Sequence, residues 1–399
     1  MRELSIYIHI PFCVRKCLYC DFLSFAVQEE RAGEIESYVN LLKREIAAQA
    51  QEYGNHQVIS VFWGGGTPSL LPAEAVSDMM TILRAYYRIA PDAEITIEVN
   101  PGTVTAEKLR AYITSGINRL SIGLQSTNDE ELKRIGRIHD YRTFQETYRL
   151  AREAGFRNIN IDLMAALPGQ SVASYEETLK RTLLLEPEHI SAYSLILEEG
   201  TPLYERQEEY CFPSEEEDRE MYLLTDSCLS ACGYHRYEIS NYAREGYECR
   251  HNKVYWQRGD YAGFGLGAAS MVGNVRWSNP SQPERYEAYV AGMATGKAQK
   301  DGPAKHSADC GRMGPVPVPE RQILTRREQM EEFMFLGLRM MCGVERQKFT
   351  ELFGQEIEEV YGEVLDRMFR QKLLVQEEDR IRLTARGVDV SNYVMAQFL

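Results

Sequence analysis

The sequence contains no apolar run that approaches the ~18 residues of a membrane-spanning helix. It also lacks a surplus of basic residues, because 45 Lys and Arg stand against 59 Asp and Glu and give a net charge of −14. That balance argues against a dedicated nucleic-acid-binding protein. With 44% hydrophobic and 26% charged residues, the 399-residue chain is typical of a soluble globular protein. A disordered, collagen-like or multi-span membrane protein is thereby excluded.

No secretory signal is predicted, since only a few apolar residues precede Pro11. Cysteines are sparse outside one short segment. Of the nine in the chain, three lie within eight residues, at Cys13, Cys17 and Cys20, and the others are scattered through the second half. An odd number of mostly isolated cysteines is typical of a reducing compartment, so we predict a cytoplasmic protein.

Six strand-length segments rich in β-branched and apolar residues occupy the first half of the chain. They span residues 5–10, 58–63, 94–99, 119–124, 158–164 and 189–196. Segments with helical spacing separate and follow them, at residues 31–53, 72–88, 105–114, 141–154, 171–185 and 214–231. Repeated strand–helix units predict an α/β fold with a parallel sheet. Because six units are fewer than the eight of a closed barrel, we expect an open sheet or a partial barrel, with its site at the carboxyl ends of the strands.

Beyond residue 233 the alternation of strands and helices is lost. Residues 234–301 form a Gly- and aromatic-rich extension, in which residues 255–277 are expected to form irregular strands. Residues 302–319 contain four prolines and are predicted to be a flexible linker. Residues 320–399 show three helices, a hairpin and a last helix, the order of a winged-helix-like domain. Since acidic residues outnumber basic ones there, we expect a docking role rather than DNA binding.

The spacing C-x3-C-x2-C places Cys13, Cys17 and Cys20 in one loop after the first predicted strand. Soft thiolate ligands select zinc or an iron–sulfur cluster. A structural zinc ion would need a fourth ligand, and only His9 is close in sequence. A four-iron cluster on three cysteines instead leaves one iron open to a small chelating molecule. We therefore predict a [4Fe-4S] cluster on these three residues.

The segment from Tyr7 to Cys20, which begins Y-I-H-I-P-F-C, resembles the signature of radical S-adenosylmethionine (SAM) proteins. Within them it is similar to the oxygen-independent coproporphyrinogen III oxidase group. The resemblance implies a partial (β/α)6 barrel over residues 1–233. It also implies that the amino and carboxylate groups of SAM chelate the open iron, and that a low-potential electron donor reduces the cluster, which can then cleave SAM to a 5′-deoxyadenosyl radical.

The resemblance further assigns a set of SAM-binding residues. They are Tyr7, Tyr19, Gly65, Gly66, Thr67, Glu98, Gln125, Arg137, Asp162 and Ile196. The sequence supports this set independently, because Glu98, Gln125 and Asp162 lie at or near the ends of predicted strands, where barrel sites collect polar groups. A departure from the family pattern is the pair at residues 165–166, which are both alanine where relatives often carry an aromatic residue and a glycine.

Two features separate the sequence from the oxidase itself. Phe22 stands where the oxidase has a fourth cysteine, and the oxidase has a long segment ahead of the cluster, whereas here twelve residues precede Cys13. The motif His-Asn-x-x-Tyr-Trp at residues 251–256 instead resembles the HemW-like subgroup of heme chaperones.

That subgroup implies heme as a further ligand, with His251 as the predicted axial ligand and Cys249 as the alternative. The resemblance implies heme-accepting proteins as partners, respiratory ones among them, and it is compatible with a transient membrane association. Nucleic acid is not expected as a partner, because of the net negative charge. Two other functions stay open: a radical SAM oxidoreductase acting on a porphyrinogen, and a SAM-binding protein with neither activity.

Overall fold

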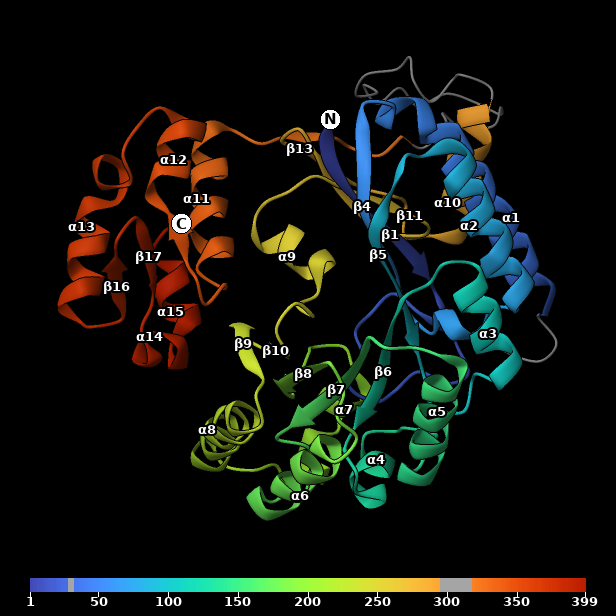
Figure 1. The fold of residues 1–399 in the computed structure, drawn as a ribbon, viewed down its shortest axis with the longest axis horizontal. Helices are drawn as coiled ribbons and strands as arrows, with labels where there is room; N and C mark the ends of the chain where they lie inside the picture. Colours follow the sequence, from blue (N-terminus) through green and yellow to red (C-terminus); the bar gives the residue numbers. More distant parts are fainter. Residues whose placement is uncertain (28–31, 295–317) are drawn as a thin grey trace.

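The computed structural model describes residues 1–27, 32–294 and 318–399 (Figure 1). Its main feature is a twelve-stranded sheet with the order β14-β13-β12-β11-β1-β4-β5-β6-β7-β8-β10-β9. Six consecutive parallel strands form its centre. They are β1 (Arg2–Ile10), β4 (His56–Gly65), β5 (Ile89–Val99), β6 (Arg119–Gln125), β7 (Ile159–Ala165) and β8 (His189–Ser194). The six predicted strands are therefore confirmed. The sheet is an open, partial barrel, because its two end strands in the described part of the chain, β14 and β9, do not pair with each other.

Helices cover the outer face of these strands (Figure 1). They are α1 (Ala32–Gln49), α2 (Ala73–Tyr86), α3 (Ala106–Thr114), α5 (Tyr141–Ala154), α6 (Val172–Leu183) and α8 (Glu215–Ala231). The short helices α4 (Asp129–Arg134) and α7 (Pro202–Glu205) lie in the connections after β6 and β8. Helix α2 illustrates how such a helix covers the sheet, because its buried apolar residues lie on one helical face. They are Val76, Met79, Met80 and Leu83. Helix α5 ends at Gly155, whose φ of 113° lies in the left-handed region that favours glycine.

The two faces of the central strands differ in chemistry because successive side chains point to opposite sides. In β5, for example, Ile95, Ile97 and Val99 belong to the main hydrophobic core, whereas the alternate residue Glu98 lines an internal cavity. The same alternation of apolar and polar residues runs through β6 and β7. The outer side of the sheet thus buries its apolar residues against helices, and the inner side forms a polar interior.

The second half of the chain completes the sheet on both sides. Strands β9 (His235–Glu238) and β10 (Asn241–Ala243) follow β8, while β11 (Tyr261–Phe264) pairs in parallel with β1. Beyond β11 lie β12 (Ala269–Val272), β13 (Val275–Ser278) and β14 (Gln322–Ile323), and helix α10 (Pro283–Ala294) packs against α1. Of the strands expected in residues 255–277, β11 becomes a seventh parallel strand, which the sequence pattern did not predict. It pairs the backbone of β1 along an edge that would otherwise be open.

The C-terminal residues form a separate small core. Its elements are α11 (Arg326–Gly337), β15 (Val344–Glu345), α12 (Arg346–Phe353), α13 (Ile357–Arg370), β16 (Leu374–Glu377), β17 (Arg380–Leu383), α14 (Ala385–Asp389) and α15 (Ser391–Ala396). This order of three helices and a hairpin is the predicted winged-helix-like one. Phe333, Phe349 and Phe353 pack against each other at its centre. The predicted linker 302–319 lies, except for its last two residues, outside the described residues.

Helix α9 (Arg250–Trp256) lies between the sheet and the C-terminal elements (Figure 1). It contacts β4 on one side and α11 on the other. The guanidinium of Arg339 lies 4.3 Å from the ring centre of Trp256, and Met341 N–H donates to the Tyr237 carbonyl oxygen over 2.9 Å. The motif at residues 251–256 is thus held between the barrel interior and the C-terminal domain.

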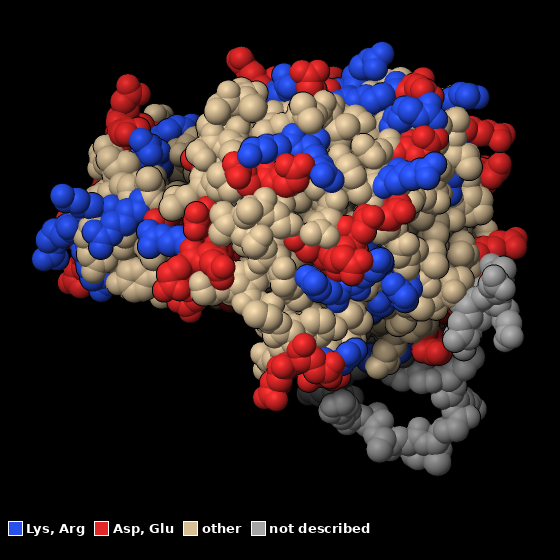
Figure 2. Space-filling model, turned by 90° about the horizontal axis from the view of Figure 1, so that it is seen from below, with Lys and Arg blue, Asp and Glu red and all other residues tan. Residues whose placement is uncertain are grey.

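None of the helices in the described part of the chain is long and apolar enough to cross a membrane. On the face drawn in Figure 2, Lys and Arg side chains are interspersed with Asp and Glu.

Candidate functional site: a cysteine loop above a polar cavity

The three cysteines lie on the loop that follows β1, at the carboxyl edge of the sheet. Short strands β2 (Phe12–Cys13) and β3 (Phe25–Ala26) pair and close this loop at its base. Its middle is fixed by Leu18, whose N–H donates to the Ile135 carbonyl oxygen over 3.0 Å. All three thiols are free and line one cavity of about 480 Å³.

The chemistry of this donor set fits a cluster better than a single ion. Burial raises the pKa of Cys20, and the neighbouring thiols of Cys17 and Cys13 add to that effect, so the three sulfur atoms share one electrostatic environment. Within residues 1–27, 32–294 and 318–399, no three His, Cys, Asp or Glu side chains are arranged to hold one metal ion. A single zinc ion needs all its ligand atoms at about 2.0 to 2.3 Å, whereas an iron–sulfur cluster gives each thiolate its own iron.

A glycine turn at the end of β4 faces the cysteines. Gly65 has a φ of 110°, and a Cβ atom there would lie 2.5 Å from the His9 ring. The following residues turn back toward the loop, because Gly66 N–H donates to the Ile10 carbonyl oxygen and Thr67 N–H to that of Phe12, at 2.8 and 2.7 Å. Only glycine can bring the backbone this close to β1, which leaves main-chain groups rather than side chains at the cavity wall.

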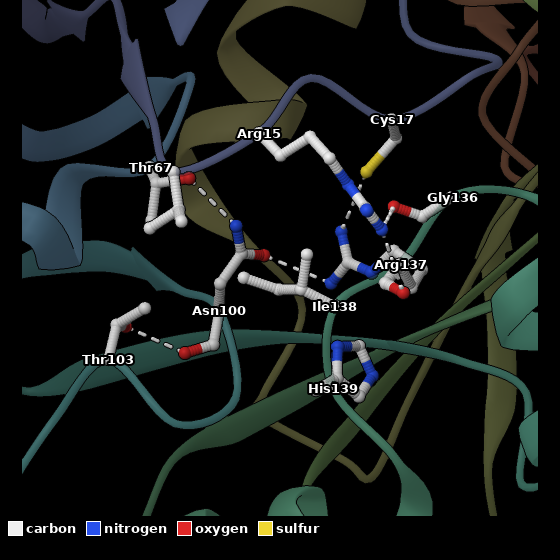
Figure 3. A pocket seen from close by; sticks show the side chains of 10 residues that line it. Arg15, Cys17, Thr67, Asn100, Thr103, Gly136, Arg137, Ile138 and His139 are labelled. Atoms are coloured by element: carbon white, nitrogen blue, oxygen red, sulfur yellow. Dashed lines mark hydrogen bonds between the residues drawn. The ribbon is translucent and has the colours of Figure 1, made fainter. Parts of the chain in front are cut away.

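A chain of hydrogen bonds connects two of the cysteines through Asn100, the residue that follows β5, and Figure 3 shows the part of this chain from Thr67 to Cys17. The Thr67 hydroxyl lies 3.5 Å from the Cys13 sulfur, and the Asn100 amide nitrogen donates to the Thr67 oxygen over 2.7 Å. The oxygen of Asn100 then accepts from Arg137 over 3.0 Å, and Arg137 also lies 3.7 Å from the Cys17 sulfur. The positions of both thiols relative to the cavity are therefore set by side chains from other elements.

Arg137 is the main cation at the upper wall of the cavity. It donates to the Gly123 carbonyl oxygen over 2.6 Å, and a Cβ atom at Gly123 would lie 2.9 Å from the guanidinium. The Nε atom of Arg137 and the Oε1 atom of Gln125 are buried without a hydrogen-bond partner. Because buried polar atoms without partners are costly, these two atoms fit a polar ligand that would pair with them.

Two carboxylic acids face these groups across the cavity. Burial, reinforced by Asp162, raises the pKa of Glu98 to about 8, although the Gly65 N–H acts in the opposite direction. Burial also raises the pKa of Asp162, against hydrogen bonds from Asn160, Tyr193 and Ser191. Glu98 is therefore mostly protonated near neutral pH, and a cationic group entering the cavity would favour its ionised form.

The structure brings most of the predicted site residues to this one cavity. The residues that line it are Cys13, Cys17, Tyr19, Cys20, Gly65, Gly66, Thr67, Glu98, Gln125, Arg137, Asp162 and Ile196. Tyr7 is not among them: its hydroxyl bonds to His9 Nδ1 over 3.0 Å and its ring stacks on Phe62 behind the wall. Ala165 and Ala166 lie at the end of β7, where Ala166 has a positive φ of 56°.

His251 also lies outside the cavity wall, although its neighbour Asn252 lines the cavity. The His251 side chain is 2% exposed. Its Nδ1 atom is 2.9 Å from the Ser60 hydroxyl, and its Nε2 atom is 2.9 Å from the Tyr255 hydroxyl. Burial lowers the pKa of His251 to about 3, so the ring is neutral at physiological pH. No nitrogen of this ring is free to approach an iron atom in this arrangement.

Comparison with known proteins agrees with the geometry. Residues 7–182 match the model of the Radical SAM superfamily, and residues 324–390 match that of the HemN C-terminal domain. The chain is 35% identical to the heme chaperone HemW of Bacillus subtilis (strain 168), with 99% of each chain covered. It is 31% identical to the heme chaperone HemW of Haemophilus influenzae, over 100% of this chain and 98% of the relative. This chain belongs to the HemW family of radical SAM proteins.

A structural comparison supports the fold of this HemW-family chain. Coproporphyrinogen III oxidase (HemN) from Escherichia coli matches with a TM-score of 0.81 and 24% identity, over 100% of this chain and 90% of that chain. At this level of identity the match shows the fold alone.

Several cavity residues of this HemW-family chain were missed by the sequence analysis. They are Asn100, Arg119, Ser121, Asn160, Ser191, Tyr193, Asn241 and Asn252. A signal for some of them was present, since β6 reads Arg-Leu-Ser-Ile-Gly-Leu-Gln and alternates polar with apolar residues. When helices cover one face of a strand, polar residues that alternate along the other face predict a polar interior over the whole length of the strand and not only at its end.

Proposed function

We propose that this protein is a heme chaperone, which binds heme and passes it to heme-accepting proteins, and that it carries a [4Fe-4S] cluster and SAM. The observation that carries this proposal is the similarity over 99% of the chain to a protein named heme chaperone HemW. The cysteine loop and the polar cavity below it support the two cofactors on physical grounds.

In this proposal, Cys13, Cys17 and Cys20 would hold the cluster. When bound, the cluster supplies low-potential electrons and one iron open to the amino and carboxylate groups of SAM. Arg137 is placed to donate to an anionic group with its buried Nε atom, and Gln125 to accept from a donor with its buried Oε1 atom. Glu98, which is mostly protonated without a ligand, would release its proton when a cationic group is bound beside it.

The position of the heme is a separate part of the proposal. Ligation of heme iron by His251 stays a prediction, and the structure adds a condition to it: the bond to Tyr255 or the bond to Ser60 must break first. Cys249 is the weaker alternative. It is 0% exposed, its thiol faces Glu94, and burial raises its pKa to about 12, which disfavours the thiolate.

The remaining functional expectations belong to the same proposal. We expect a cytoplasmic protein that uses a low-potential electron donor, that does not bind nucleic acid, and that associates with membranes at most transiently. On the face drawn in Figure 2, acidic groups are interspersed with basic ones. This supports the expectation that the protein does not bind nucleic acid there, because phosphate binding requires clustered Lys and Arg.

The test is a heme transfer measurement on anaerobically reconstituted protein. Heme is titrated until its absorption band saturates, the excess is removed, and an apoprotein that gains a distinct spectrum with heme is added. We expect one heme per chain and its transfer to the acceptor. Absence of saturable heme binding in protein with a full cluster would contradict the proposal.

A second candidate is a radical SAM oxidoreductase acting on a porphyrinogen, for which the match of residues 324–390 to the model of the HemN C-terminal domain is the supporting observation. Phe22 argues against it, because its exposed, apolar side chain stands where that oxidase carries a further cysteine. We expect no decarboxylation of coproporphyrinogen III under reducing, anaerobic conditions. Catalytic formation of protoporphyrinogen IX would establish the second candidate instead.

A further inference from the structure

The cavity continues below the residues expected to bind SAM. Gln125 is the last residue of β6 and Arg119 is its first, so the two lie about 20 Å apart along the strand at a rise of ~3.3 Å per residue. Arg119 nevertheless lines the same cavity, together with Ser121, Asn160 and Ser191 from three neighbouring strands. We call Arg119, Asn160, Asn241 and Asn252 the cavity floor. None of the four belongs to the predicted SAM site.

Arg119 is an unusual residue to find in this place. Its side chain is 2% exposed, and its Nε atom is buried without a hydrogen-bond partner. In the described part of the chain, its guanidinium interacts with the Cys249 thiol, Glu94 and Asp162 through charge alone, without an ion pair or hydrogen bond to them. A buried guanidinium without a paired anion is costly, because the cation has lost its water without gaining direct partners.

The two carboxylates whose charge acts on Arg119 make their hydrogen bonds elsewhere. Glu94 accepts the N–H groups of Arg250 and His251 at 3.1 Å and faces the Cys249 thiol at 3.4 Å. It therefore serves the N-terminus of α9. Asp162 accepts from Asn160 over 2.8 Å and lies 3.3 Å from the Ser121 hydroxyl. Both act on Arg119 only through space, as the Cys249 thiol does, and the Nε atom of Arg119 is left without a hydrogen-bond partner.

We propose that Arg119 binds the carboxylate of a second ligand, a small organic monocarboxylate held at the cavity floor together with SAM. The planar guanidinium matches a planar carboxylate and can form two parallel hydrogen bonds with it. A monoanion fits better than a phosphate, because Glu94 and Asp162 lie near the same point and would repel a second negative charge. The orphan Oδ1 atom of Asn241 offers an acceptor for a hydroxyl or amino group of the same molecule.

This second site uses none of the cluster ligands. It lies inside the barrel and adjoins the motif at residues 251–256, because Asn252 lines its floor and the charge of Arg119 acts on His251 behind the cavity wall.

The test uses 3,3,3-trifluoropropionate as the probe and ¹⁹F NMR as the readout, with anaerobic holoprotein saturated with SAM. The neutral 3,3,3-trifluoropropanol has nearly the same shape and serves as the matched ligand. We expect saturable line broadening with the carboxylate but not with the alcohol. We also expect at least tenfold weaker binding of the carboxylate to Arg119→Gln. Arg15→Gln is the matched protein control, since Arg15 lines the rim of the same cavity, and it should bind the probe like wild type.

Equal binding of the alcohol and the carboxylate would overturn the proposal, and so would an unchanged carboxylate affinity in Arg119→Gln. Competition by SAM that abolishes carboxylate binding would overturn it as well, because the cavity floor would then be part of the SAM site. If Arg119→Gln does not fold, crystals of wild-type protein soaked in 3-bromopropionate decide the matter. An anomalous bromine peak in the cavity with the carboxylate on Arg119 supports the proposal, and a cavity floor without the probe overturns it.

Discussion

Replacement of His251 by alanine tests how much this buried ring contributes to the stability of the fold. The ring shares one hydrogen bond with the Ser60 hydroxyl and one with the Tyr255 hydroxyl. It also stacks on Phe62, with 5.1 Å between the ring centres. Each hydrogen bond contributes about 1 kcal/mol net, and deletion of a buried ring costs about 3 kcal/mol or more. Ser60 keeps its bond to Ser5, so the hydroxyl left without a partner is that of Tyr255. We expect the free energy of unfolding to fall by about 3 to 5 kcal/mol.

The pH dependence of this effect follows from the pKa of His251. Burial lowers it to about 3 in the folded protein, whereas an unfolded histidine has a pKa of about 6.5. Above pH 6.5 the ring is neutral in both states. Below that value the unfolded ring takes up a proton and the folded ring does not, so the stabilising contribution is lost as the pH falls from about 6.5 toward 3. His251→Gln cannot titrate, so its stability deficit should shrink by about 1.4 kcal/mol between pH 7.5 and pH 5.5.

The assay is urea denaturation of wild type, His251→Ala and His251→Gln at the two pH values, with a heme titration of each folded protein. A stability loss below about 1 kcal/mol in His251→Ala, or a deficit that does not change with pH, would refute the structural role derived above. Heme ligation by His251 predicts in addition a shifted heme absorption band in the folded variant. An unchanged band would assign the ring to the structure alone, and a shift in Cys249→Ser alone would move the ligand to the thiol.

Three further predictions concern other parts of the molecule. Cys17→Ala, reconstituted anaerobically, should lose most of its iron and the broad cluster absorption, and wild-type iron content would exclude Cys17 as a ligand. Arg137→Ala should weaken SAM binding at least tenfold in calorimetry, because a charge-assisted hydrogen bond contributes about 1.5 to 3 kcal/mol, and unchanged affinity would remove Arg137 from the site. Glu45→Ala should lower the free energy of unfolding by about 3 kcal/mol, since this buried carboxyl group accepts hydrogen bonds from Gln49, Asn279, Tyr286 and Gly265 N–H; an unchanged melting temperature would contradict that role.

Features that depend on local order could be predicted from the sequence. The spacing of Cys13, Cys17 and Cys20 fits all three into one loop, and the alternation of strand and helix defines the six parallel strands. Because parallel strands end at one edge of a sheet, Glu98, Gln125 and Asp162 could be expected to meet there before any distance was known. The structure places all three at one cavity.

Features that depend on contacts between distant segments could not be predicted. The role of His251 depends on which face of α9 meets β4, and the aromatic motif at residues 251–256 is compatible with a ligand as well as with a buried partner of Ser60. The parallel pairing of Tyr261 with Ser5 likewise depends on which edge of the sheet the returning chain reaches.

Arg119 shows the difference most clearly. Its place in an alternating strand indicates that it points to the interior, because side-chain direction has a period of two residues along a strand. Whether an interior arginine is paired depends on where Glu94 and Asp162 direct their oxygens, and that is set by α9 and β7. Local sequence order is enough to predict the strands, the cysteine loop and the edge of the sheet at which the site lies. Which buried groups are paired, and which are left open to a ligand, becomes known from the folded chain, because pairing depends on ångström-scale distances between segments that are far apart in the sequence.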